Sequence, residues 1–215
     1  MPSCCYGDEY NSMFTTEEAN RTAKRFRRRG LSRSTTELAE AVTARVSPGA
    51  TMIEVGGGVG ELQVALLEAG VVDRALNVEM STNWEPAAAS LLADRRLTDR
   101  VERVVGDFVD LAESLPPADV LLMHRVLCCY PDWEKMLTAA RSRAKLLIGI
   151  TLPDDRWTSH IYVRISNLLI AARRMRFRGF VHPVGRMVET MEGSNFRVRF
   201  DRAHHVWRTI VFERT

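Results

Sequence analysis

The 215-residue sequence contains no long hydrophobic run and no strong excess of one charge. No stretch approaches the roughly 18 apolar residues of a membrane-spanning helix, and the first residues lack the basic start and apolar segment of a signal peptide. With 30 basic and 27 acidic side chains, the formal net charge is only +3, which by itself does not indicate a nucleic-acid partner. We therefore expect a cytoplasmic protein that works without a membrane or a nucleic acid.

Cysteine is scarce, and its placement argues against the usual metal sites. The four cysteines form two adjacent pairs, Cys4-Cys5 and Cys128-Cys129, without the Cys-x-x-Cys spacing that brings two thiolates to one zinc ion. The histidines are not spaced to complete a ligand set. We expect reduced thiols and no metal; a metal or redox site shared by the two pairs is the minor alternative.

One basic cluster, residues 24–29, lies just before Gly30. It is either a surface for phosphate, membrane or an acidic substrate, or the solvated end of a helix whose charges complement the helix dipole. We favour the second interpretation, because Gly30 is a typical helix stop.

Short apolar segments alternate with longer amphipathic ones from residue 50 onward. Strands are expected at 51–55, 75–79, 101–105, 118–123 and 145–150, and helices at 61–69, 85–97 and 132–141. Such repeats predict a mostly parallel sheet with helices on both faces. After residue 153, helices at 157–175 and 184–191 precede two alternating strands, 196–200 and 206–212. These strands predict an antiparallel finish to a seven-stranded α/β sheet.

The chain length suits one compact domain. Two helices, from Thr15 or Thr16 to Gly30 and over 35–46, begin it. We expect residues 1–47 to form an N-terminal helical cap and 48–152 a cofactor-binding core. Residues 153–183 are expected to form a lid or acceptor-site helix carrying Tyr162, Arg164 and Asn167, and 184–215 a C-terminal helix and hairpin.

A glycine-rich turn follows the first expected strand, with Glu54 two residues before the series Gly56, Gly58 and Gly60. Glycines allow a tight turn and let a bulky ligand approach the backbone, while the next helix offers free N–H groups. The spacing differs from the Gly-x-Gly-x-x-Gly fingerprint of dinucleotide enzymes. It therefore argues against a nicotinamide cofactor.

Two further acids end the next strands. Glu79 closes the second strand, where a carboxylate suits ribose hydroxyls, and Asp107 follows the third in the sequence Gly106-Asp107-Phe108. Each acid alone is better explained as a helix cap or a surface charge. Features at three successive strand ends together predict one nucleotide-like ligand.

The segment from Glu54 to Gly60 resembles motif I of class I S-adenosylmethionine-dependent methyltransferases. Residues 26–31, 77–81, 105–108 and 124–132 extend the likeness to a bacterial group similar to magnesium-protoporphyrin O-methyltransferase. The resemblance implies a Rossmann-like class I methyltransferase fold, in which Asp107 accepts a hydrogen bond from adenine and Phe108 packs on its ring. Phe26 departs from the pattern, since relatives commonly carry tyrosine there. The implied S-adenosylmethionine site comprises Glu54, Gly56, Gly58, Gly60, Glu79, Met80, Asp107, Phe108 and His124.

Candidate acceptor-side residues follow the fourth strand. His124 is a general base, a group that positions the cofactor, or a purely structural residue. Tyr130 orients the acceptor or closes the pocket, or else it only packs within its loop. His182 is a second candidate base. Arg125 meets either an acceptor carboxylate or, as we favour, a surface acid. Trp207 is expected to be structural.

We therefore expect a monomer or homodimer that methylates a small aromatic or heterocyclic metabolite in bacterial secondary metabolism. The main alternative is a methyltransferase-fold enzyme that uses a bound sulfonium for a non-methylating reaction, such as intramolecular alkylation or cyclisation. A nicotinamide enzyme and a binding module without turnover are further alternatives. The mass of the product separates the first two.

Overall fold

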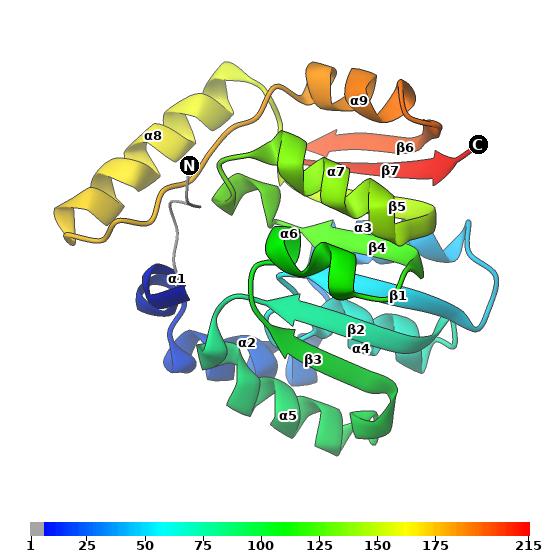
Figure 1. Ribbon diagram of the computed structural model, residues 1–215. Helices are drawn as coiled ribbons and strands as arrows, with labels where there is room; N and C mark the ends of the chain where they lie inside the picture. The colour runs from blue at the N-terminus through cyan, green and yellow to red at the C-terminus, as the bar shows by residue number, and fades with distance from the viewer. Residues whose placement is uncertain (1–6) are drawn as a thin grey trace.

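A seven-stranded sheet forms the centre of the protein, which a computed structural model describes over residues 7–215 (Figure 1). Cys4 and Cys5 lie outside the described residues. The strands lie in the order β3-β2-β1-β4-β5-β7-β6, and only β7 runs opposite to its neighbours. This architecture confirms the predicted sheet. The strands are β1 (Ala50–Val55), β2 (Val72–Glu79), β3 (Val101–Val105), β4 (Ala118–His124), β5 (Ala144–Pro153), β6 (Phe196–His204) and β7 (Trp207–Arg214).

Helices cover both faces of the sheet, because alternate residues of each strand point to opposite sides. In β4, Leu121 and Met123 join one apolar cluster and Val120 and Leu122 the other. The first cluster is covered by α6 (Phe108–Leu111), α7 (Trp133–Arg143) and α9 (Val184–Glu192). The second is covered by α2 (Thr16–Arg29), α3 (Arg33–Thr43), α4 (Glu61–Glu68) and α5 (Glu85–Asp94).

The strand order reverses where β1 lies beside β4. Both strands are parallel and adjacent, but the chain leaves them toward opposite sides of the sheet. Such a switch point leaves a crevice at the carboxyl ends of the strands, where ligands bind in open α/β sheets. The residues after β1, β2, β3 and β4 are therefore brought to one edge.

The bounds of α2 agree with the sequence prediction. The side chain of Thr15 accepts a hydrogen bond from the Glu18 backbone N–H, and Gly30, with φ of 69°, ends the helix. The basic end of α2 docks on its neighbours: Arg25 pairs with Glu61 of α4 and Arg27 with Asp94 of α5. This part of the cluster thus has local partners.

Helix α8 (Trp157–Ala172) stands away from the sheet (Figure 1). Its inner side carries the buried Ser159 and contacts Gly179 through Val163 and Asn167. The helix ends three residues before the predicted end, and a short helix, α1 (Gly7–Met13), precedes α2. No helix within residues 7–215 is long and apolar enough to cross a bilayer. Large apolar side chains are exposed on α8 at Trp157, Ile161, Tyr162, Ile165, Leu168 and Leu169.

Strands β5 and β6 are longer than predicted. Both strands pair with the antiparallel β7, and this pairing continues beyond their apolar segments. It extends to Pro153 in β5 and to His204 in β6, and each of these residues lies opposite Trp207. Backbone pairing, which does not depend on side-chain polarity, sets these ends.

We predict that Gly149→Val lowers the free energy of unfolding by about 1–3 kcal/mol, the usual cost of overpacking a core. A Cβ at Gly149 of β5 would lie 2.7 Å from Leu122 Cδ2 and 2.8 Å from Leu38 Cδ1. Urea unfolding measures the effect. The control is Gly185→Ala in α9, where no atom lies within 4 Å of an added Cβ and alanine favours the helix. An unchanged midpoint for Gly149→Val would contradict the described packing.

Candidate active site

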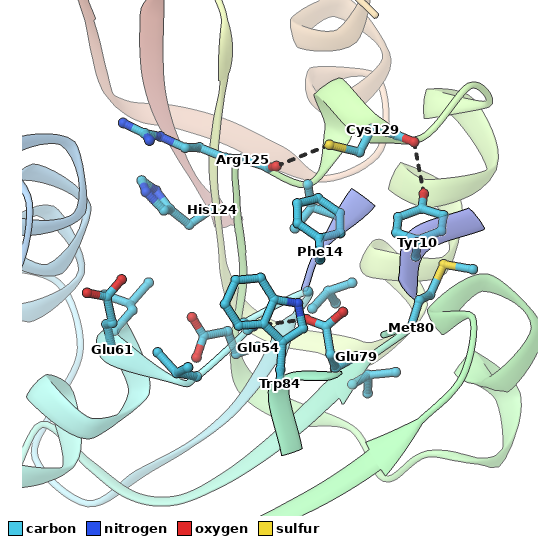
Figure 2. Close-up of a pocket in the computed structure, with 18 of the residues that line it drawn as sticks. Tyr10, Phe14, Glu54, Glu61, Glu79, Met80, Trp84, His124, Arg125 and Cys129 are labelled. Atoms are coloured by element: carbon cyan, nitrogen blue, oxygen red, sulfur yellow. Dashed lines mark hydrogen bonds between the residues drawn. The ribbon is translucent and has the colours of Figure 1, made fainter. Parts of the chain in front are cut away.

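A cavity of about 340 Å³ opens at the carboxyl ends of β1, β2, β3 and β4 (Figure 2). The structure brings together there nearly all the residues proposed from the sequence. Among the proposed cofactor-binding and catalytic residues, Gly60 and His182 are the exceptions, since neither lines the cavity. The predicted residues that line it are Glu54, Gly56, Gly58, Glu79, Met80, Asp107, Phe108, His124 and Tyr130.

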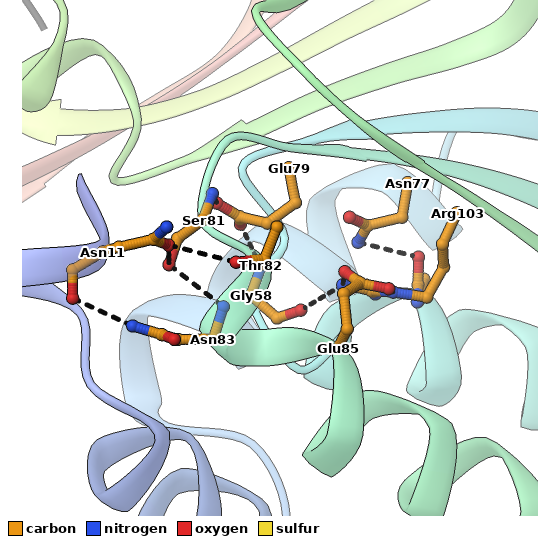
Figure 3. Close-up of polar contacts among 10 residues, drawn as sticks. Asn11, Gly58, Asn77, Glu79, Ser81, Thr82, Asn83, Glu85 and Arg103 are labelled. Atoms are coloured by element: carbon orange, nitrogen blue, oxygen red, sulfur yellow. Dashed lines mark hydrogen bonds and ion pairs between the residues drawn. The ribbon is translucent and has the colours of Figure 1, made fainter. Parts of the chain in front are cut away.

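The glycine turn after β1 is held by side chains from neighbouring elements (Figure 3). Gly58, with φ of 57°, donates its N–H to Glu79 Oε2 at 2.9 Å, and its carbonyl accepts from Arg103 Nη2 at 2.9 Å. Arg103 of β3 is in turn fixed by Glu85, with Nη2 2.7 Å from Oε1 and Nε 3.0 Å from Oε2. Hydrogen bonds to the N–H and to the carbonyl of Gly58 therefore fix the conformation of the turn.

Gly57 allows the closest approach in this turn. An added Cβ would overlap the amide of Asn77 and lie 2.7 Å from Glu54 Cδ. Its φ is not positive, so lack of space, and not backbone strain, requires glycine here. The sequence prediction was based on the alternate glycines and assigned no role to Gly57 or Arg103. The run of three consecutive glycines at residues 56–58 could have indicated that Gly57 is also required.

Glu54 lies buried beneath the turn. Its side-chain Oε2 has no hydrogen-bond partner among the described residues. Burial raises its pKa to about 8, although the positive charge of Arg103 acts in the opposite direction. The side chain is thus mainly protonated at neutral pH, and a cationic group placed beside it would favour its ionised form.

Glu79 at the end of β2 uses both carboxylate oxygens. Oε2 accepts from Gly58 N–H and Oε1 accepts from Ser81 N–H at 3.0 Å. Burial raises the pKa of Glu79, against the effect of these two hydrogen bonds. Each oxygen retains a lone pair for a further donor, as a ribose hydroxyl would require.

The N-terminal segment is tied to the turn after β2 (Figure 3). Asn11 of α1 accepts a hydrogen bond from Ser81 Oγ at 2.8 Å through its side chain. Asn83 Nδ2 donates to the backbone carbonyls of Asn11 and Phe14, at 2.9 and 2.8 Å. These bonds place α1 beside the cavity.

An aromatic wall results from this placement (Figure 2). Tyr10, Phe14 and Trp84 line the cavity, with the Phe14 ring 5.8 Å from that of Trp84 and 6.1 Å from that of Tyr10. The Tyr10 hydroxyl donates to the carbonyl of Cys129 at 2.9 Å. The sequence did not predict this wall, because only tertiary contacts bring α1 to the sheet edge.

Asp107 and Tyr130 form a pair. Asp107 Oδ1 caps α6 by accepting from Val109 N–H at 2.9 Å, and Oδ2 accepts from the Tyr130 hydroxyl at 3.2 Å. Burial and the adjacent carboxylate raise the pKa of Tyr130, while burial also raises that of Asp107. Tyr130 therefore stays protonated and acts here as a donor, not as a base.

His124, at the end of β4, lies at the cavity with its Nε2 3.2 Å from Thr35 Oγ1. Thr35 Oγ1 lies 2.6 Å from Ser32 Oγ, and His124 Nδ1 is buried without a partner among the described residues. Burial, together with the adjacent positive charge of Arg125, lowers the pKa of His124 to about 3. The imidazole is thus neutral at physiological pH.

His182 has a different role from the predicted one. Its buried Nε2 lies 2.8 Å from the Leu127 carbonyl and 3.0 Å from the Tyr130 carbonyl, so it donates a shared hydrogen bond to the loop after β4. A nitrogen that carries this proton is not a base for an acceptor, and the geometry does not support that prediction. Phe26 of α2 packs in the apolar core and does not line the cavity.

The lid residues are also away from the cavity. Asn167 exchanges two hydrogen bonds with the backbone of Gly179, at 2.7 and 2.9 Å, and neither it, Tyr162 nor Arg164 lines the cavity. The Cys128 thiol donates to the Arg125 carbonyl at 3.2 Å and lies 3.6 Å from Cys129 Sγ. From residue 7 onward, no group of three or more His, Cys, Asp or Glu side chains is placed to share a metal ion.

The sequence is similar to known O-methyltransferases. A family model described as the O-methyltransferase domain matches residues 3–143. Mitomycin biosynthesis 6-O-methyltransferase of Streptomyces lavendulae is 34% identical over an alignment of 152 residues that covers 66% of this chain and 42% of that protein. The chain thus spans less than half the length of this curated relative.

Solved structures share the fold. Magnesium protoporphyrin IX methyltransferase from Synechocystis PCC 6803 with bound SAH has a TM-score of 0.69 at 15% identity, covering 97% of this chain and 94% of that one. Mitomycin 7-O-methyltransferase has a TM-score of 0.61 at 26% identity, covering 85% of this chain and 54% of that one. These likenesses confirm the predicted Rossmann-like methyltransferase fold. Because the family model covers more than half of it, the chain belongs to the O-methyltransferase domain family, in agreement with the class I methyltransferase resemblance of its glycine turn and strand-end acids.

Proposed function

We propose that this protein transfers the methyl group of S-adenosylmethionine to an oxygen atom of a small aromatic or heterocyclic metabolite in bacterial secondary metabolism. The observation that carries the proposal is the convergence of Gly58, Glu79 and Asp107 on one cavity. Family membership supports the reaction class, and the mitomycin-biosynthesis relative supports the metabolic setting.

The described residues fit this cofactor. The unpartnered, buried oxygen of Glu54 suits the ammonium of its amino-acid end, and the clamped turn at Gly58 offers an approach to the backbone. Glu79 suits the ribose hydroxyls, while Phe108 and Asp107 suit the adenine ring and its amino group. When bound, S-adenosylmethionine supplies a methyl group on a sulfonium, which is already a good leaving group.

The protein itself contributes alignment and exclusion of water. The aromatic wall and the buried strand ends shield the cavity, and neutral His124 positions a ligand through its free Nδ1. A strong base is not required for a nucleophile that is held in line with the methyl group. We therefore assign His124 a positioning role.

The first test is binding of S-adenosylhomocysteine by calorimetry. Gly58→Val is expected to abolish it, because valine is strained at a φ of 57° and its side chain would project toward Trp84 in the cavity. Asp107→Ala is expected to weaken binding by about tenfold to a hundredfold, the usual effect of losing a hydrogen bond to a charged group.

The matched control is Asp110→Ala, an exposed acid of the same helix outside the cavity, which should bind normally. Unchanged affinity in both cavity variants, with retained circular dichroism, would remove the cofactor site. With wild-type protein, mass detection of a product bearing one added methyl group supports methylation. A cyclised or eliminated product would instead favour the non-methylating alternative.

Cofactor binding is also expected to release a proton from Glu54. The free side chain, with its pKa of about 8, is mostly protonated at pH 7, and an adjacent ammonium favours the ionised form and lowers that pKa. Calorimetry in buffers of different ionisation enthalpy measures the release, which should approach one proton at pH 7 and vanish in Glu54→Gln. Equal proton release by both proteins would show that Glu54 does not face the cationic group.

At saturating cofactor, kcat is expected to show no ionisation of His124. Because its pKa is lowered from 6.5 to about 3, the imidazole is neutral at every pH above that value, including the range from about pH 5 to pH 8 in which histidine normally titrates. The wild-type profile and that of His124→Asn should therefore have the same shape. A fall in kcat on the acidic side of about pH 6.5 that disappears in His124→Asn would identify His124 as a general base.

A further inference from the structure

Arg125, directly after β4, has an unusual backbone conformation. Its φ is 60°, in a left-handed region that costs a non-glycine residue about 1 kcal/mol or more. Among the described non-glycine residues with a positive φ, Arg125 alone lines the cavity. The residue is held in this conformation from both sides: its N–H donates to the Thr151 carbonyl at 2.8 Å, and its carbonyl accepts from the Cys128 thiol at 3.2 Å. This conformation directs the side chain to the mouth of the cavity, which Arg125 lines.

Two contacts fix the guanidinium there. Its central carbon lies 4.2 Å from the centre of the Trp207 ring, which begins β7, and Nη2 donates to Ser34 Oγ of α3 at 2.9 Å. Stacking on one face leaves the edge of the planar group free for a ligand. Nη2 has a second N–H that Ser34 does not use, and neither Nε nor Nη1 forms a hydrogen bond with another described residue, so one edge of the guanidinium keeps two free donors. Trp207, expected to be structural, thus supports a residue of the cavity.

No acid neutralises this charge. None of the carboxylates within residues 7–215 forms an ion pair with Arg125, so the surface partner favoured from the sequence does not form. Glu61, the acid whose charge acts on it, is already engaged by the two hydrogen bonds from Arg25, at 2.7 and 3.0 Å. Arg125 therefore remains an unpaired cation at the cavity, next to His124 (Figure 2).

We propose that Arg125 is a specificity-determining residue that binds a carboxylate of the methyl acceptor, with Trp207 as its support. The inference rests on the proposed function and adds to it the acceptor class, aromatic acids. A guanidinium binds a carboxylate through paired N–H···O bonds in one plane, which matches the free edge. A carboxylate engaged in this way is a poor nucleophile, so the methyl group is accepted by another oxygen of the same molecule.

The test compares two probes of the same shape and different charge. Protein saturated with S-adenosylhomocysteine is titrated with 4-hydroxybenzoate and with 4-hydroxybenzamide by calorimetry. Wild-type protein is expected to bind the carboxylate at least about tenfold more tightly, within the range of hydrogen bonds between charged groups. Arg125→Gln should remove this preference, whereas Arg125→Lys should keep part of it, because lysine retains the charge but lacks the planar fork.

Arg28→Gln is the control: it removes the same charge from an exposed position of α2 outside the cavity. It should leave the preference unchanged, and S-adenosylhomocysteine should bind every variant as it binds the wild type. Failure of wild-type protein to bind the carboxylate, equal affinity for the two probes, or a preference that persists in Arg125→Gln would overturn the inference. Failure of the wild type to bind S-adenosylhomocysteine would instead overturn the proposed function.

Discussion

The backbone of Gly58 is held by Glu79 on its N–H and by Arg103 on its carbonyl, and the rest of the site depends on this arrangement. The turn follows β1, while the two side chains belong to β2 and β3, so one residue joins three strands. Arg103 is itself fixed by Glu85. A turn whose shape is already determined does not have to be ordered when a ligand binds, which reduces the free energy lost on binding.

Around this fixed turn, the two sides of the cavity differ in character. Tyr10, Phe14 and Met80 form an apolar side, whereas His124 and Arg125 form a polar side near β4 (Figure 2). The apolar side suits a flat ring, and the polar side carries a neutral imidazole beside an unpaired cation. This division separates the groups suited to the cofactor from those suited to the acceptor.

Local sequence was enough to predict the sheet, the glycine turn and the acids Glu79 and Asp107, because parallel strands bring their carboxyl ends to one edge. It was not enough for His182, whose role depends on carbonyls more than 50 residues away in the chain. The aromatic wall was missed for the same reason: Tyr10 and Phe14 reach the cavity only through the bonds of Asn11 and Asn83. Likewise, pairing with β7 determined the ends of β5 and β6, and a pattern of apolar residues carries no information on such partners.

The attachment of α1 to the turn after β2 also makes the cavity depend on the local stability of this segment. The same short segment supplies both the bonds of Asn11 and the rings of Tyr10 and Phe14 that close one side of the cavity. Because α1 is short, local unfolding that breaks these bonds also removes the two rings from the cavity wall. The shape of the cavity is thereby linked to the stability of seven residues at the start of the described chain.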